Sequence, residues 1–263
     1  MRATFVVPTL DEAESIGPVL ETFRRAAEEA NATTFQSRPI DWEVLVIDGA
    51  STDGTPATAE RAGARVIVEP RRGYGRAYKT GFAAAHGEII ATADGDGTYP
   101  VETIPALVDR LQRESIDFLT GNRMAFITRR AMSTEHRIGN RVLNTFLGVT
   151  FHHWLKEMAS GPLVDSQSGF WVFRREVLDR VHISQDGMAF SEELKIEAIL
   201  RGLRVVEVPI HYGERYGRPK LSSWRDGGQN FVFLAKKRLA IAREASRGRP
   251  VPFAHGPDAV PPR

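Results

Sequence analysis

The sequence contains no cysteine, so disulfide bonds and thiol chemistry are excluded. It also lacks any run of about 18 apolar residues of the kind that spans a membrane. The first residues lead directly into a strand-like segment at 4–7, without the charged and apolar regions of a signal peptide. These absences favour a chain that is made and kept in the cytoplasm, a reducing compartment.

A strong net charge is also absent, because the formal net charge at pH 7 is only +2. Binding to nucleic acid is therefore not indicated. The charge is uneven, since residues 201–263 contain thirteen Lys and Arg against five Asp and Glu. A basic C-terminal third favours a phosphate-bearing ligand or an anionic membrane surface, with a solvated basic face as the alternative.

What remains is an ordinary globular composition, with 42% hydrophobic and 26% charged residues in a chain of 263. Short apolar runs alternate with amphipathic stretches, which is typical of an α/β domain with a mostly parallel central sheet flanked by helices. We expect strands at 3–7, 43–47, 66–69, 88–93 and 118–121. We expect helices at 12–30, 56–62, 75–85 and 104–113.

The second half of the sequence is less regular. Expected helices lie at 137–155, 192–201 and 224–244, and expected strands at 169–173 and 205–212. Five prolines after Arg247 argue against an ordered element at that end. We therefore expect a main domain over 1–222, an amphipathic helix over 223–246 and a proline-rich, disordered tail over 247–263.

Two carboxylates flank one glycine in Asp94-Gly95-Asp96, directly after an expected buried strand. Residues i and i+2 of an extended segment share a face, so both side chains can reach one hard divalent cation and hold a diphosphate through it. Gly95 lets the backbone approach such a ligand closely. The alternative is a simple turn, because Asp-Gly pairs are common turn formers.

Asp48 follows the expected strand at 43–47, where its carboxylate can read the edge of a nucleobase. Ligands of parallel sheets bind at the carboxyl ends of the strands, so we favour ligand contact for Asp48. For Ser51 and Asp53 we favour capping of the following helix.

The segment Pro8-Thr9-Leu10-Asp11-Glu12 closes the first expected strand. Thr9 or Asp11 can cap the helix that follows, and Glu12 can complement the helix dipole. Ligand contact becomes the better interpretation once the neighbouring strands also end in ligand residues.

The three segments at 8–12, 48–53 and 94–96 resemble those of the family-two glycosyltransferases. Three later segments narrow the likeness to the dolichol-phosphate mannose and glucose synthases. They are Asp165-Ser166-Gln167-Ser168-Gly169-Phe170, Ser191-Glu192-Glu193-Leu194, and Glu207-Val208-Pro209-Ile210 with residues 215–221. The likeness runs in order from about residue 3 to about residue 221.

The resemblance implies a GT-A fold with a Rossmann-like N-terminal half and a nucleotide-diphosphate-sugar donor, such as GDP-mannose or UDP-glucose. It also implies Mg²⁺ or Mn²⁺ as cofactor, inversion at the anomeric carbon and a polyprenyl or dolichyl phosphate acceptor. By the same likeness, Asp94 and Asp96 match the family's metal-binding motif. The positions that match its donor-binding segments are Pro8, Thr9, Glu12, Asp48, Asp94 and Arg76. For Arg76, a purely structural role is an equal alternative.

The positions that match segments beside the acceptor and its phosphate are Arg123, Asp165, Glu193, Arg215 and Lys220. The resemblance thus assigns catalysis to Asp96, Arg123 and Asp165. A lipid phosphate is already anionic, so Asp165 would then position the acceptor or assist. A hydroxyl acceptor would instead need Asp165 or Glu193 to remove a proton.

Three positions depart from the family pattern. Gly49 stands where a second aspartate is usual, Asp11 where asparagine is common, and Pro219 where serine is common. All three lie outside the Asp94-Gly95-Asp96 motif. They weaken any inference about which nucleobase and which sugar the donor carries.

A dehydrogenase and a non-catalytic binding module are two other classes of function for a chain with such a sheet. A dehydrogenase would need a glycine-rich turn after the first strand, and residues 8–11 do not supply one. A transferase with a soluble hydroxyl or phosphate acceptor stays open as an alternative. So does a non-catalytic module that binds nucleotide sugars.

The expected helix at 224–244 combines apolar and basic residues. The apolar ones are Trp224, Phe231, Phe233, Leu234 and Ile241, and the basic ones are Lys236, Lys237, Arg238 and Arg243. Such a helix can lie in a membrane interface, which favours a peripheral protein at the cytoplasmic face of a membrane. The alternative is that the apolar stripe packs on the main domain.

Overall fold

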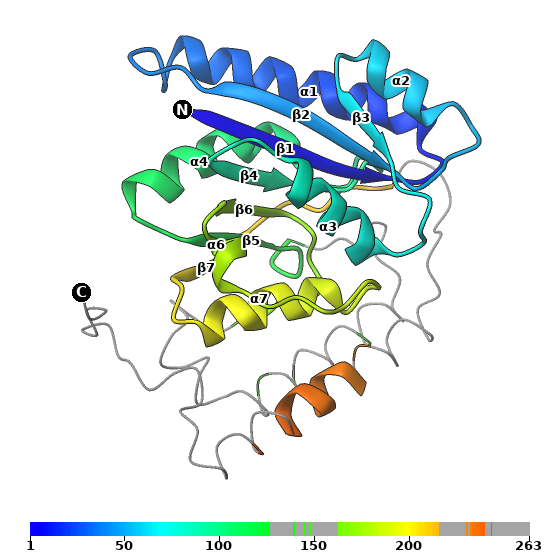
Figure 1. Cartoon of the computed structure of the whole chain (residues 1–263). Helices are drawn as coiled ribbons and strands as arrows, with labels where there is room; N and C mark the ends of the chain where they lie inside the picture. The colour runs from blue at the N-terminus through cyan, green and yellow to red at the C-terminus, as the bar shows by residue number, and fades with distance from the viewer. Residues whose placement is uncertain are drawn as a thin grey trace.

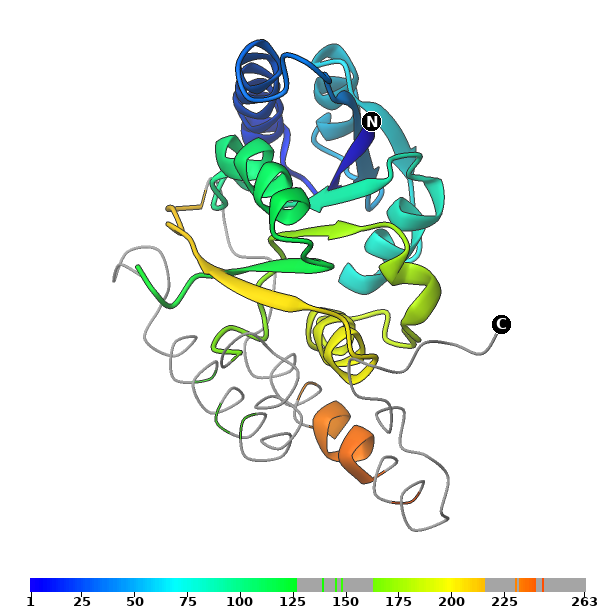
Figure 2. The same cartoon turned by 90° about the vertical axis from the view of Figure 1, so that its left-hand side faces the viewer.

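The computed structural model describes residues 1–126 and 163–215, with residues 139, 145, 148, 230, 232–239 and 243. Its centre is a seven-stranded sheet with helices on both faces (Figures 1 and 2). The strands are β1 (Arg2–Thr9), β2 (Asp41–Asp48), β3 (Arg65–Val68), β4 (Ile89–Thr92), β5 (Phe118–Asn122), β6 (Trp171–Arg174) and β7 (Val205–Pro209). The helices are α1 (Ala13–Ala32), α2 (Thr55–Arg61), α3 (Tyr74–Ala84), η1 (Val101–Thr103), α4 (Ile104–Arg113), α6 (Val177–Arg180) and α7 (Phe190–Leu200).

The strand order is β3-β2-β1-β4-β6-β5-β7. Every neighbouring pair is parallel except those of β6, which runs antiparallel to β4 and to β5. The predicted mostly parallel α/β sheet is therefore confirmed. The order 3-2-1-4 of the first four strands is that of a Rossmann-like half, as expected.

Side chains of β1 alternate between two cores because successive residues of a strand point to opposite faces. Phe5 and Val7 pack with α1, α2 and α4, whereas Val6 packs with α3 and α7. Figure 2 shows α1 and α4 on one side of the sheet and α3 on the other. Gly81 of α3 permits a close approach to the sheet, since an added Cβ would lie 2.6 Å from Val6 Cγ1.

The predicted elements of the N-terminal half are confirmed, with bounds that differ by at most two residues at either end. The expected strand at 169–173 begins only at Trp171, because residues 168–170 after the turn at 166–167 have no strand structure. The expected strand at 205–212 ends at Pro209, and the short helix α6 was not predicted. The expected helix at 137–155 lies outside the described residues, apart from three isolated positions.

Residues 232–239 are helical and lie against the main domain. Phe233 and Leu234 are buried in the same core as α7, and Lys237 forms an ion pair with Glu197 of that helix. At these residues the apolar stripe packs on the domain, which was the alternative interpretation. The remainder of the expected helix at 224–244 and the tail at 247–263 lie outside the described residues apart from 230 and 243, so the domain division stays a prediction.

The carboxylate of Glu43, near the start of β2, connects this strand by hydrogen bonds to β1, to β3 and to the residues after α3. Glu43 accepts hydrogen bonds from Thr4 Oγ1 (2.7 Å), the backbone N of His86 (2.9 Å) and Arg65 Nη2 (2.7 Å). Burial opposes its ionisation, but these hydrogen bonds outweigh burial and lower the pKa of Glu43 to about 2. Glu43 precedes Asp48 by five residues of the same strand, which is roughly 17 Å along β2.

Candidate active site

Several of the predicted site residues gather at the carboxyl ends of β1, β2, β4 and β5. Thr9 and Asp48 lie opposite each other at the ends of β1 and β2, and Asp94 follows β4. Arg123 is the first residue after β5. Because β6 runs antiparallel, its start lies at this same edge, so the segment that precedes it brings Asp165 beside Arg123.

Asp94 lies between an aromatic side chain and the turn before β6. Its Oδ1 accepts a hydrogen bond from Tyr74 Oη (2.9 Å). An added Cβ at Gly169 would lie 2.1 Å from that hydroxyl and 3.5 Å from Asp94 Oδ1, so only glycine fits there. Burial, followed by the neighbouring charge of Asp96, raises the pKa of Asp94 to about 6.

Asp96 is buried, and among the described residues only its Oδ1 accepts hydrogen bonds, while Oδ2 has an ion-pair contact but no hydrogen-bond partner. Its Oδ1 accepts from the backbone N (3.0 Å) and Oγ1 (2.6 Å) of Thr98, and its Oδ2 pairs with Arg215 Nη2 at 2.8 Å. The first loop lies close to this motif, because an added Cβ at Gly95 would lie 2.5 Å from Glu12 Oε2. The structure thus brings Glu12, Asp94, Asp96 and Arg215 together.

A divalent cation fits the two aspartates. Within the described parts of the chain, no group of three or more His, Cys, Asp and Glu side chains is placed to hold a metal by itself. Mg²⁺ commonly binds through one or two carboxylates and completes its shell with water and substrate phosphates, so two suffice. Burial and, after it, the charge of Asp96 raise the pKa of Asp94, and a bound dication would oppose both effects by stabilising the two ionised carboxylates.

We expect Arg215→Met to bind Mn²⁺ about fivefold more tightly in the absence of nucleotide. The guanidinium of Arg215 neutralises Asp96 and repels a cation, and removing an ion pair of this kind shifts a competing equilibrium by about 1 kcal/mol. Turnover should fall, because phosphate loses a positive partner. Titration of Mn²⁺ followed by electron paramagnetic resonance measures the affinity. Arg110→Met, which removes the ion pair with Glu114 just after α4, is the control and should leave the affinity for Mn²⁺ unchanged. Weaker Mn²⁺ binding to Arg215→Met would contradict the assignment.

Asp48 is fully buried, and both carboxylate oxygens are bonded within the chain. Oδ1 accepts from Thr9 Oγ1 (3.1 Å) and Ser51 Oγ (2.6 Å), while Oδ2 accepts from the backbone N of Ser51 (2.8 Å). In this arrangement Asp48 organises the loop after β2. Its contact with a nucleobase stays a prediction.

Side chains that follow β2 accept hydrogen bonds from the backbone at the start of α1. The backbone N of Glu12 donates to Thr55 Oγ1 (2.7 Å), and that of Ala13 donates to Asp53 Oδ2 (2.9 Å). Asp53 Oδ1 also accepts from the backbone N of Thr55, the first residue of α2. The expected capping is therefore confirmed for Asp53, which also accepts from the start of α1, but not for Ser51, whose Oγ donates to Asp48 and accepts from the backbone N of Asp11. Asp11, considered as a cap for α1, instead accepts from the backbone N of Thr52 (2.8 Å).

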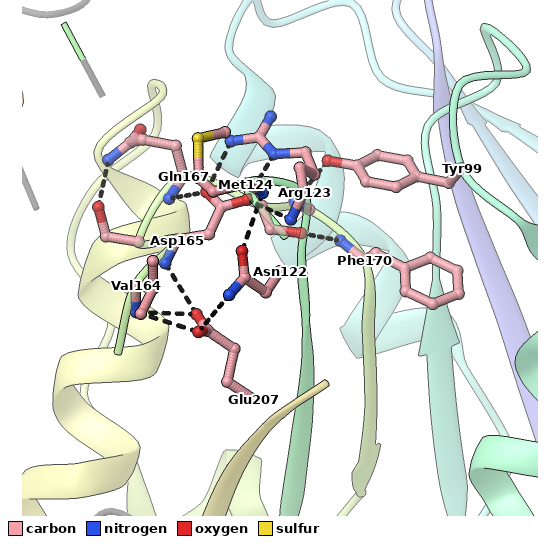
Figure 3. Close-up of polar contacts among 12 residues, drawn as sticks. Tyr99, Asn122, Arg123, Met124, Val164, Asp165, Gln167, Phe170 and Glu207 are labelled. Carbon is pink, nitrogen blue, oxygen red and sulfur yellow. Dashed lines mark hydrogen bonds and ion pairs between the residues drawn. The ribbon is translucent and has the colours of Figure 1, made fainter. Parts of the chain in front are cut away.

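Arg123 and Asp165 form a buried bidentate ion pair (Figure 3). Arg123 donates from Nε to Oδ2 (2.7 Å), from Nη2 to Oδ1 (2.8 Å) and from its backbone N to Oδ2 (2.9 Å). The backbone N of Gln167 adds a fourth hydrogen bond (3.2 Å). Burial alone would raise the pKa of Asp165, but Arg123 more than offsets it and lowers that pKa. A carboxylate with four donors and a lowered pKa is a poor proton acceptor.

Glu193 is engaged elsewhere. Its carboxylate accepts from the backbone N and Oγ of Ser184 and from the backbone N of Gln185, in the loop before α7. The preceding residue, Glu192, is the one that reaches the turn before β6, where its Oε1 accepts from Ser166 Oγ (2.9 Å). Burial raises the pKa of Glu192 to about 7. Sequence reasoning missed Glu192 because all eleven residues of α7 are buried, so periodicity does not distinguish its faces.

Two further basic residues, Arg76 and Lys220, were predicted as part of the site. Arg76 forms an ion pair with Asp186, which Lys79 also contacts at 2.8 Å. This arrangement ties α3 to the loop before α7 and fits the structural alternative. Lys220 lies outside the described residues, so its contact with phosphate stays a prediction.

Solved structures of glucosyl-3-phosphoglycerate synthase from Mycobacterium tuberculosis resemble this one. The complex with Mn²⁺, UDP and phosphoglyceric acid has a TM-score of 0.63 at 23% identity and covers 90% of this chain and 78% of that chain. The complex with Mn²⁺, UDP-glucose and phosphoglyceric acid has a TM-score of 0.67 at 22% identity, covering 90% and 79%. The sheet is therefore the GT-A fold of glycosyltransferases, as expected.

The family follows from the sequence comparison. The model described as glycosyl transferase family 2 matches residues 4–181, and the chain belongs to this family. A dolichyl-phosphate hexose transferase of Haloferax volcanii is 32% identical over 228 residues, which are 84% of this chain and 87% of the relative. The low-salt glycan biosynthesis hexosyltransferase Agl6 of the same organism is 33% identical over 231 residues, 87% of this chain. This match covers 52% of Agl6, so the chain spans about half the length of that relative.

Proposed function

We propose that this chain is an inverting glycosyltransferase that moves a hexose, mannose or glucose, from a nucleotide diphosphate sugar to a polyprenyl or dolichyl phosphate. GDP-mannose and UDP-glucose are the donors that we propose. Relatives named for dolichyl-phosphate transfer support the acceptor class, and the neighbouring structure with UDP-glucose supports the donor class.

The observation that carries the acceptor class is the state of Asp165. A hydroxyl acceptor has to lose a proton when it attacks, so it needs a general base. Asp165 is saturated by Arg123 and Gln167, and Glu193 by residues 184 and 185. A phosphate acceptor avoids this need because its oxygen is already ionised near neutral pH. The two proposed bases are therefore better suited to positioning than to proton removal.

In the reaction, an oxygen of the acceptor phosphate attacks the anomeric carbon of the sugar from the side opposite the diphosphate. The bond from that carbon to the diphosphate oxygen breaks, and the configuration inverts. Asp94 and Asp96 would hold Mg²⁺ or Mn²⁺, which supplies positive charge to the leaving diphosphate when bound. Arg215, which pairs with Asp96, and Arg123, which pairs with Asp165, would bring positive charge to the phosphates.

A membrane surface is the partner that this acceptor requires. Within the described residues, no helix has the length and apolar character to cross a bilayer. In the C-terminal segment Val232 and Leu239 are exposed, and Lys236 is exposed beside them. We propose that this segment meets the cytoplasmic face of a membrane while Phe233 and Leu234 anchor it to the domain.

The test is a screen of GDP-mannose and UDP-glucose, each with Mg²⁺ or Mn²⁺, against three acceptor conditions. These are polyprenyl phosphate in anionic phospholipid vesicles, soluble 3-phosphoglycerate, and no acceptor. Mass spectrometry should find a hexosyl polyprenyl phosphate with one of the donors. Product on 3-phosphoglycerate alone would establish a soluble acceptor instead. Donor binding without any product would identify a binding module and refute the proposal.

A further inference from the structure

The segment that carries Asp165 has no helix or strand of its own between residues 163 and 170. Its backbone is held from two sides, by Glu207 of β7 and by Lys195 of α7. Neither residue was predicted as part of the site, and the hydrogen bonds of both to this segment go to its backbone rather than to the side chain of Asp165. Their contacts are with the backbone on both sides of the Asp165 side chain.

Glu207 holds the N–H groups. Its Oε1 accepts from the backbone N of Asp165 (2.8 Å), and both of its oxygens lie 3.1 Å from the backbone N of Val164. Its Oε2 also accepts from Asn122 Nδ2 (2.9 Å), at the end of β5 (Figure 3). One carboxylate therefore ties the start of this segment to the residue that directly precedes Arg123.

Lys195 holds the carbonyl groups. Its Nζ donates to the carbonyl oxygens of Asp165 (2.8 Å) and Ser166 (3.0 Å), and the side chain is fully buried. Burying an ammonium group is costly unless hydrogen bonds repay the loss of water, and an apolar residue of similar volume often serves stability as well. A charge at this position is better explained by the geometry that it imposes.

That geometry matters because a bidentate pair tolerates little displacement. With its N–H bound to Glu207 and its C=O bound to Lys195, the peptide groups on either side of Asp165 are fixed, and the carboxylate faces the guanidinium of Arg123. The same segment continues to Gly169, which lies against Tyr74 and Asp94. A shift of this segment would move the ion pair and the wall of the metal site together.

We propose that Glu207 and Lys195 are positioning residues that hold the backbone of Asp165 so that the Arg123–Asp165 pair faces the donor and acceptor phosphates. The inference rests on the glycosyl transfer of the proposed function but not on the identity of the acceptor. Failure of the proposed function would appear as absence of turnover in the unchanged protein. Failure of this inference would appear only in the variants.

The experiment compares Glu207→Gln and Lys195→Met with a control, Glu43→Gln, in the full chain. Glu43 is also a carboxylate that accepts a backbone N–H, but it lies toward the other end of the sheet. We expect kcat to fall about thirtyfold in the two positioning variants, with the donor KM within twofold of the unchanged protein. The control should keep kcat within twofold at a similar loss of Tm. Equal kcat in all three variants at matched Tm would overturn the inference.

A double-variant cycle tests whether these residues act through Asp165. If they do, Glu207→Gln should cost about thirtyfold in the unchanged background but less than threefold in an Asp165→Asn background. Full additivity of the two losses would overturn the inference. If Lys195→Met or Glu207→Gln does not fold, Lys195→Arg and Glu207→Asp give the same comparison, because each keeps the charge but alters the reach. Circular dichroism and binding of the nucleoside diphosphate establish that each variant is folded.

Discussion

Asp96→Asn is expected to lower kcat by about a thousandfold or more while leaving the fold intact. The diphosphate gains negative charge as it leaves, and catalysis by a bound cation depends on how firmly that cation is held. Asparagine keeps an oxygen for the hydrogen bonds from Thr98, but it loses the charge that Asp96 offers a cation. Turnover with saturating Mn²⁺ measures the loss, and circular dichroism measures the fold.

The control for this experiment is Asp109→Asn, which removes a surface carboxylate paired with Arg113 on α4 and should leave turnover unchanged. Excess chelator should stop the unchanged protein, and added Mg²⁺ or Mn²⁺ should restore it. If the protein stays fully active in chelator, the metal role of Asp94 and Asp96 has to be abandoned.

Asp165→Asn is expected to lower kcat about a hundredfold and to reduce the free energy of unfolding by about 3 kcal/mol, because Arg123 is left as a buried charge without its partner. Burial would raise the folded-state pKa of Asp165, but Arg123 more than offsets burial and lowers it, so this carboxylate is ionised at neutral pH. Its stabilising contribution is present above the unfolded pKa and is lost only as the pH falls through the lower, folded pKa. Its titration therefore does not shape the rate near neutral pH.

The pH dependence of kcat/KM distinguishes a positioning role from a base. A phosphate acceptor has a pKa of about 6, and that group should produce an acidic limb in both the unchanged protein and Asp165→Asn. Loss of the limb in the variant, with every acceptor, would instead assign Asp165 as the general base. Asp117→Asn is the matched control, since Asp117 accepts from the backbone N of Arg204 just before β5, at the strand's opposite end.

Much of the donor half was predictable because its signals are local. Apolar runs that alternate with amphipathic stretches predicted β1 to β5 and α1 to α4, and polar residues at the strand ends predicted where the site lies. The pair Asp94 and Asp96 was recognisable because a two-residue spacing after a buried strand places two carboxylates together. Asp53 was recognised as a cap for the same reason, since capping depends on neighbours in the chain.

The acceptor half could not be predicted in the same way, because its arrangement depends on contacts between residues that are distant in sequence. The sequence pattern indicated a strand near 169–173, but it contained nothing about the strand's direction. Because β6 is antiparallel, residues 165–170 lie at the same edge as Asp94 and Arg123 rather than at the opposite edge. Glu192 and Glu193 are adjacent in sequence, and only the packing of α7 decides which of them reaches Ser166.

The sequence by itself determined the fold class, the family and the close spacing of the two aspartates that we propose as metal ligands, because each depends on periodicity or short spacing. Tertiary structure alone decided which charges are available for chemistry. Arg123 neutralises Asp165 across 42 residues of sequence, and Arg215 pairs with Asp96 across more than a hundred. Ionisation depends on burial and on the nearest charge, and both are set by atoms that the fold brings together from distant parts of the chain.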